Sequence, residues 1–112
     1  MIQAVLRQSL VGAAFLAVTH GAWATDSAQL ERGKTLFTSA AVPACAVCHT
    51  LADAGTSGTI GPDLDELKPG MDQIKRVLRE GDGAMPSFSA TMSEADMNAV
   101  AAYVVHATGG AK

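Results

Sequence analysis

The chain has 112 residues, a formal net charge of −3 and only two cysteines. This length suggests one small domain at most, and the mild acidity argues against a nucleic-acid binder, because such proteins normally carry a basic patch. Aromatic residues make up 4% of the chain. A domain this small often needs a cross-link, a metal or another added group, so we expect it to pack around something that is not protein.

The first 24 residues have the layout of a secretory signal peptide. Arg7 precedes the apolar stretch 10–18, and the AWA sequence at 22–24 fits an A-x-A cleavage site. The apolar stretch is shorter than the roughly 20 residues of a transmembrane helix. We therefore expect export and cleavage after Ala24, which leaves residues 25–112 as one mature domain.

The first helix is expected over about residues 27–41. Asp26 suits its N-cap position, and Pro43 should end it, because a proline disfavours helical geometry in the residue before it. Residues 44–50 are expected to form a short turn. The following stretch, 51–70, is rich in Gly, Thr, Ser and Pro without a sustained period, so it is predicted to be mostly loop. A loop of this length is usually functional or wrapped around something.

Two further helices follow the long loop. Asp72 can cap a helix over about 73–80 with its apolar side chains on one face, and Gly81 suits its C-terminal end. Ser93 can cap the last helix, which the glycine pair 109–110 ends. Since no segment alternates like a strand, the sequence predicts an all-α fold.

The two cysteines and a histidine form a C-x-x-C-H motif: Cys45, Cys48 and His49. A structural zinc site takes four Cys or His ligands, and the mature sequence lacks a second ligand pair. Thiol–disulfide enzymes carry C-x-x-C near a βαβ unit, but no strand pattern precedes Cys45. A plain disulfide would explain neither the histidine nor the long loops. The motif is typical of covalent attachment of c-type haem, with the two thiols bonded to the porphyrin and His49 as the proximal iron ligand.

Two loop residues fit the same chemistry. A metal-bound histidine normally donates its second ring N–H to an acceptor, and the carbonyl group of Pro62 suits that role. Met85 precedes Pro86, which favours an extended, stiff backbone, so its thioether is expected to reach the iron from the face opposite His49. The other methionines of the mature part fit helix packing or capping instead: Met71, Met92 and Met97.

With these residues assigned, the mature part resembles a class I c-type cytochrome over nearly its whole length. The resemblance implies that Cys45 and Cys48 bind one haem c covalently and that His49 and Met85 are the axial iron ligands. It also implies that Pro62 accepts the proximal hydrogen bond.

The same resemblance implies three main helices and long loops wrapped around the haem. The first and last helices are expected to cross closely, with Gly33, Phe37 and Tyr103 at the contact. Many members hold the haem propionates with a Trp or Tyr, and the mature sequence departs from this pattern because it has no Trp.

Residues 41–70 resemble, more narrowly, the cytochrome subunits of bacterial periplasmic sulfite dehydrogenases, which pair with a molybdenum-containing subunit. The implied function is periplasmic one-electron transfer, with no catalysis by the chain itself and a redox protein as partner. A general shuttle to a terminal oxidase or another dehydrogenase is the alternative. A haem enzyme or gas sensor would need an open distal site, and a thiol oxidoreductase would lack haem. His106, near the end of the last helix, is a minor alternative as distal ligand.

A group of cationic side chains just before the Met85 loop is a candidate docking face for a redox partner, against the simpler interpretation of a solvated helix surface. Its members are Lys68, Lys75, Arg76 and Arg79.

Overall fold

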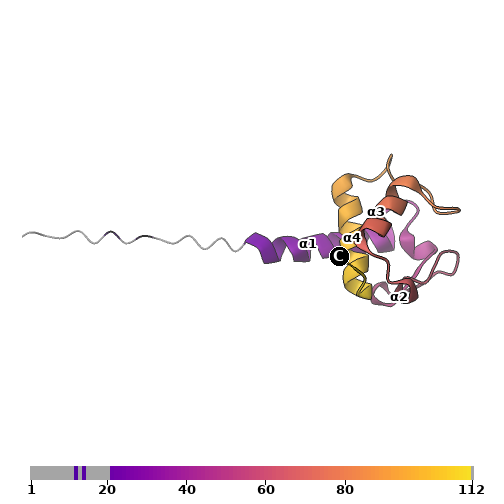
Figure 1. Cartoon of the computed structure of the whole chain (residues 1–112), viewed down its shortest axis with the longest axis horizontal. Helices are drawn as coiled ribbons and strands as arrows, with labels where there is room; N and C mark the ends of the chain where they lie inside the picture. Colours follow the sequence, from indigo (N-terminus) through magenta and orange to yellow (C-terminus); the bar gives the residue numbers. More distant parts are fainter. Residues whose placement is uncertain (1–11, 13, 15–20, 112) are drawn as a thin grey trace, which may run out of the picture.

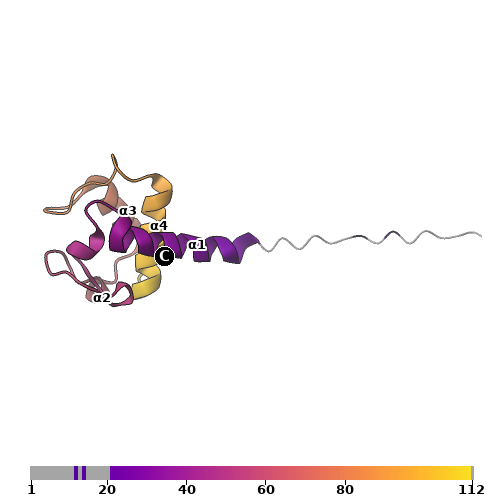
Figure 2. The same cartoon turned by 180° about the vertical axis from the view of Figure 1, so that it is seen from behind.

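The computed structural model describes residues 12, 14 and 21–111. Most of the expected signal peptide lies outside these residues. Within the described part, four α-helices and several short elements surround one core, and α1 crosses α4 on one side of it (Figures 1 and 2). The α-helices are α1 (Gly21–Thr35), α2 (Leu64–Leu67), α3 (Met71–Glu80) and α4 (Glu94–Thr108). None of the helices in the described residues is both long and apolar enough to cross a bilayer.

The short elements lie between α1 and α2. A π-helical turn, η1 (Leu36–Ala40), continues α1, and two 3-10 turns follow, η2 (Cys45–Val47) and η3 (Ala52–Ala54). The strands β1 (Thr50–Leu51) and β2 (Thr56–Ser57) pair antiparallel. The predicted helical architecture is confirmed, but the small hairpin was missed, because two residues per strand are too few to show an alternating pattern.

The crossing of α1 and α4 depends on a glycine. A Cβ atom on Gly33 would lie 2.1 Å from the carbonyl oxygen of Ala99 and 2.6 Å from the Cβ of Tyr103, so only glycine allows this close approach. Beside it, the rings of Phe37 and Tyr103 meet edge to face with centroids 6.1 Å apart. The expected contact between the first and last helices is therefore confirmed.

The helix starts differ from the expectations in two places. The first helix begins at Gly21, so Asp26 lies inside α1 rather than at its N-cap. The helix α3 begins at Met71 with Gly70 as its N-cap. Asp72 instead lies in the first turn, where its negative charge interacts favourably with the helix dipole. In both places the helix starts before the aspartate that was expected to cap it.

The last helix follows the prediction. The hydroxyl of Ser93 accepts a hydrogen bond from the N–H of Asp96 at 3.1 Å, and Gly109 ends α4 with a left-handed backbone, φ 73°. The short helix α2 was not predicted. It is capped by Asp63, whose carboxylate accepts from the N–H groups of Asp65 and Glu66, within a segment too short for a helical period.

Candidate functional site

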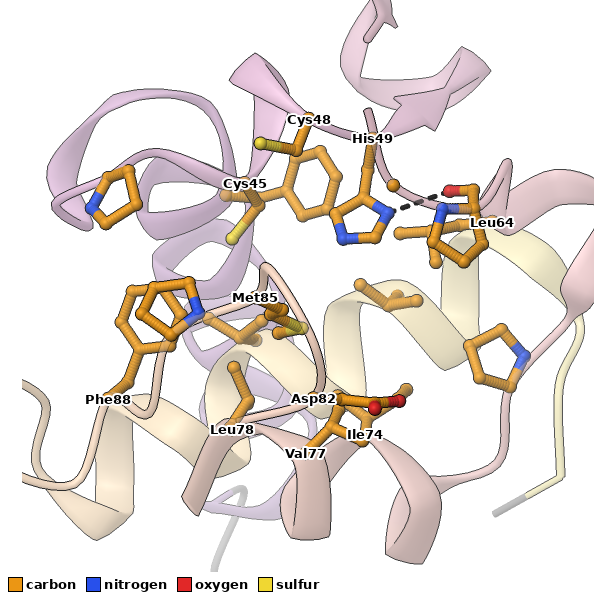
Figure 3. Close-up of a pocket in the computed structure, with 18 of the residues that line it drawn as sticks. Cys45, Cys48, His49, Leu64, Ile74, Val77, Leu78, Asp82, Met85 and Phe88 are labelled. Atoms are coloured by element: carbon orange, nitrogen blue, oxygen red, sulfur yellow. Dashed lines mark hydrogen bonds between the residues drawn. The ribbon is translucent and has the colours of Figure 1, made fainter. Parts of the chain in front are cut away.

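A cavity of about 300 Å³ lies between the C-x-x-C-H turn and α3. Its walls come from η1, η2, α2, α3, α4 and the loop before α4, and most of the lining side chains are apolar. Several of these belong to the buried core, among them Phe37, Leu64, Ile74, Leu78, Phe88 and Val104. These core side chains therefore surround an apolar space and do not fill it (Figure 3).

The C-x-x-C-H turn forms one wall of the cavity. The N–H groups of Cys48 and His49 both donate to the carbonyl oxygen of Cys45, at 3.1 and 2.9 Å. This tight turn places the two thiols and the imidazole on the same side, where all three side chains line the cavity. The returning loop packs directly on it, because a Cβ atom on Gly58 would lie 2.6 Å from the carbonyl carbon of Cys48.

The imidazole of His49 is fixed by the loop that follows. Its Nδ1 donates to the carbonyl oxygen of Pro62 at 2.7 Å, which leaves Nε2 as the ring nitrogen with a free lone pair. The backbone of Gly61 lies against the ring, since a Cβ atom there would be 2.5 Å from Cε1 of His49. The structure thus joins the two residues that sequence reasoning paired for this hydrogen bond.

Met85 lies on the wall opposite His49 (Figure 3). Its backbone N–H and carbonyl are both bonded to Asp82, at 2.9 and 3.0 Å, in a tight turn where Gly83 has a φ of 56°. The half-buried Met85 side chain lines the cavity. A thioether and an imidazole therefore face one apolar space from two sides.

All five residues singled out from the sequence meet at this cavity: Cys45, Cys48, His49, Pro62 and Met85. Met92 and Met97 are buried in the core and are absent from its lining. His106 is exposed on α4 and lines a separate polar pocket with Tyr103.

Sequence reasoning did not identify Gln73 and Asp82, the other two polar side chains that line the cavity. Neither belongs to a recognisable motif. Gln73 lies on α3 and Asp82 in the loop after it, so only the folded arrangement brings them to the same space. Helical spacing did indicate the apolar face of α3 that lines this wall.

The Cys45 thiol is poorly suited to act as the attacking group in disulfide exchange. Burial raises the pKa of the Cys45 thiol to about 11, whereas thiol–disulfide enzymes lower the pKa of the attacking cysteine to stabilise its thiolate. The environment of Cys45 therefore argues against the thiol-oxidoreductase alternative.

The donor set and the cavity fit a covalently attached haem. Two thiols and an imidazole on one wall, a thioether on the other and apolar side chains between them are the groups that a c-type haem uses. A helical fold around such a cavity defines the class of c-type cytochromes.

The comparisons with known proteins agree. The family model described as "Cytochrome C oxidase, cbb3-type, subunit III" matches residues 28–104. The chain is similar to cytochrome c6 of Tetradesmus obliquus, with 34% identity over 96 residues, covering 77% of this chain and 99% of the relative. Its structure is similar to that of the c-type cytochrome SorU from Sinorhizobium meliloti, with a TM-score of 0.71 and 40% identity, covering 77% of this chain and 98% of the other.

The chain therefore belongs to the cytochrome c family and is a class I c-type cytochrome. Its cofactor is covalently bound haem c, and its general function is that of an electron carrier. The predicted family, fold class and cofactor are confirmed.

Proposed function

We propose that the protein is a periplasmic one-electron carrier in which Cys45 and Cys48 hold one haem c through thioether bonds. In this proposal, the imidazole of His49 and the thioether of Met85 would bind the iron. The observation that supports it is the meeting of these four side chains at one apolar cavity, with His49 and Met85 on facing walls. Bound haem supplies a reversible one-electron couple between ferric and ferrous iron.

The residues around the cavity each contribute to this function. The carbonyl of Pro62 orients His49 and raises its basicity. The Met85 thioether, as a weak donor, favours ferrous iron and raises the reduction potential. With His49 and Met85 both bound to the iron, a substrate would have no open site there, and the chain itself would act as an electron carrier rather than as an enzyme.

The periplasmic location is supported by the signal-peptide layout of residues 1–24. The proposed electron donor is a molybdenum-containing sulfite dehydrogenase, because residues 41–70 resemble the cytochrome subunits of those enzymes. A general shuttle between another dehydrogenase and a terminal oxidase is the second candidate, since small cytochromes serve many partners.

Production in a host that attaches c-type haem tests the cofactor and the processing together. Intact-mass measurement is expected to give residues 25–112 plus one haem. A retained leader in the membrane fraction would contradict the location, and a colourless protein would contradict the function.

Substitution of Met85 tests the distal ligand. Met85→Ala should abolish the weak sulfur-to-iron charge-transfer band of the oxidised protein and allow the reduced protein to bind carbon monoxide. The matched control, Met92→Leu, should leave both properties close to wild type. Loss of the band in Met92→Leu with retention in Met85→Ala would show that the ligand assignment is wrong.

The partner is tested by purification from the native periplasm. Sulfite is expected to reduce the cytochrome only when a sulfite dehydrogenase is present, and that enzyme should co-purify. Reduction by a different dehydrogenase at a higher rate would favour the general-shuttle alternative.

A further inference from the structure

The loop that carries Met85 is bonded to the end of α3. The last carbonyl groups of a helix lack partners within the helix. Here the carbonyl of Val77 accepts from the N–H of Gly81 at 2.8 Å, and that of Leu78 accepts from the N–H of Phe88 at 2.7 Å. The loop thus leaves α3 at Gly81, passes through Met85 and returns to the same helix end at Phe88.

The next carbonyl along the helix is bonded by two side chains. The carbonyl oxygen of Arg79 accepts hydrogen bonds from the hydroxyl groups of Ser87 and Ser89, the latter at 2.8 Å. The Ser87 hydroxyl also accepts from the N–H of Ser89 at 3.3 Å. Two hydroxyls from the returning half of the loop therefore hold one backbone atom of α3.

The helix end that receives these bonds is itself anchored. The guanidinium group of Arg79 forms a two-point ion pair with the carboxylate of Glu94 at the start of α4, with distances of 3.0 and 2.8 Å. The loop also lies very close to the helix end, because a Cβ atom on Gly81 would be 2.8 Å from the carbonyl oxygen of Met85. A small release of the loop would therefore move Met85 directly.

We propose that Ser87 and Ser89 are positioning residues that hold the Met85 thioether toward the cavity by bonding the Arg79 carbonyl. The proposal rests on the proposed role of Met85 as an axial ligand. The turn between Asp82 and Met85 fixes the shape of the loop tip, whereas the two hydroxyls fix the whole loop against α3. Without them, the loop spends more time displaced and Met85 leaves the iron more often.

Competition with imidazole measures this displacement in the oxidised, haem-loaded protein. Imidazole can bind only when Met85 has left, so its apparent affinity is the intrinsic affinity multiplied by the fraction of protein with the loop displaced. Ser87→Ala/Ser89→Ala should raise the apparent affinity about tenfold, the effect of losing two modest hydrogen bonds. Each single variant should raise it about threefold. The readout is the loss of the charge-transfer band during titration.

Two controls separate positioning from general stability. Ser87→Thr/Ser89→Thr keeps both hydroxyls at exposed positions and should stay within about twofold of wild type. Ser39→Ala removes a similar hydroxyl-to-helix bond, to the carbonyl of Thr35 at 3.3 Å, and should also leave imidazole affinity unchanged.

The outcomes are distinct. Unchanged imidazole affinity in the single and double alanine variants, with or without a lower melting temperature, would overturn the positioning role. If the double variant does not fold, the single variants decide. Persistence of the charge-transfer band in Met85→Ala would instead contradict the proposed ligand, and with it the basis of this inference.

Discussion

The Nδ1 atom of His49 lies 2.7 Å from the carbonyl oxygen of Pro62, thirteen residues further along the chain. Between the two, the chain turns back through the β1–β2 hairpin and approaches the imidazole so closely that Gly61 has no room for a side chain. The orientation of the proposed proximal ligand is therefore set by the loop as well as by the C-x-x-C-H turn.

Gly61→Ala should weaken this hydrogen bond, because the new Cβ atom would lie 2.5 Å from the His49 ring and force the ring or the loop to move. A histidine that donates less strongly is a weaker ligand for ferric iron, so the reduction potential should rise. Loss of one hydrogen bond corresponds to about 20 to 60 mV for a one-electron couple. Potentiometric titration measures the change. Thr59→Ala, at an exposed position of the same loop, should leave the potential unchanged, and an unchanged potential in both variants would contradict the prediction.

Gly33→Ala should destabilise the protein through the crossing of α1 and α4. The added Cβ atom would overlap the backbone of Ala99, and overpacking of this kind costs about 1 to 3 kcal/mol in the free energy of unfolding. Denaturant unfolding of the haem-loaded protein measures it. The control Thr35→Ala, at an exposed position of the same helix, should change stability by less than about 0.5 kcal/mol. If Gly33→Ala and Thr35→Ala had the same free energy of unfolding, α1 and α4 could move apart at little cost in stability.

The features that could be predicted from the sequence are those that depend on residues close together in the chain. The C-x-x-C-H spacing, the capping of α4 by Ser93 and the stiff Met85–Pro86 step depend on neighbouring residues, so they are readable without a structure. The position of Gln73 and Asp82 at the cavity, and the bonds from Ser87 and Ser89 to Arg79, depend on how α3 and the loop pack. The expected start of α3 failed for the same reason, because Met71 is bonded to the backbone of Ala111 from the far end of the chain.

A variant without haem should lose most of its native structure. The cavity borders core side chains that include Phe37 and Leu78, and these would meet water or collapse if the space were empty. Cys45→Ser/Cys48→Ser, prepared without haem, should therefore show much less helix than the haem-loaded wild type by circular dichroism. A cooperative thermal melt with native-like helix content in that variant would contradict this prediction.

The hydrogen bond between Tyr103 and Asp53 should make stability depend on acid pH. The Tyr103 hydroxyl donates to the carboxylate at 2.5 Å. This bond is the main reason why the pKa of Asp53 lies below its ordinary value, and Lys34 adds to the effect. Because the folded pKa is lowered, the stabilisation is present above the ordinary pKa and is lost as the pH falls below it. As the pH falls from about 5 to about 3, the free energy of unfolding of Tyr103→Phe should therefore decrease less than that of the wild type.

Wild type and Tyr103→Phe should differ by less than about 1 kcal/mol in this acid-induced loss of stability. The effect is small because the Asp53 side chain is 49% exposed and solvent screens its charge. Asp53→Asn should flatten the pH dependence to a similar degree, and the double variant should be no flatter than either single variant. Additive effects of the two substitutions would show that the residues act independently.

The candidate docking face is smaller than its four cationic residues suggested. Arg79 is held by Glu94 at 2.8 Å, so its charge is largely compensated. Arg76 is exposed and Lys75 half-buried on α3, the helix whose other face lines the cavity, and Lys68 is exposed at the end of α2. An acidic redox partner would therefore be attracted mainly by Lys68, Lys75 and Arg76.

Arg76→Glu tests this face with a matched control. At low ionic strength the rate of electron transfer from a sulfite dehydrogenase should fall by up to about tenfold, and the difference from wild type should shrink as salt is added. Lys34→Glu makes the same change in net charge on α1, which packs against α4, and replaces an exposed ion pair with Asp53 by a repulsion between two carboxylates. Its rate should stay closer to wild type at every salt concentration. If the two variants slow the reaction equally, net charge alone guides the encounter. If neither changes it, this part of α3 is a solvated helix surface and the partner docks elsewhere.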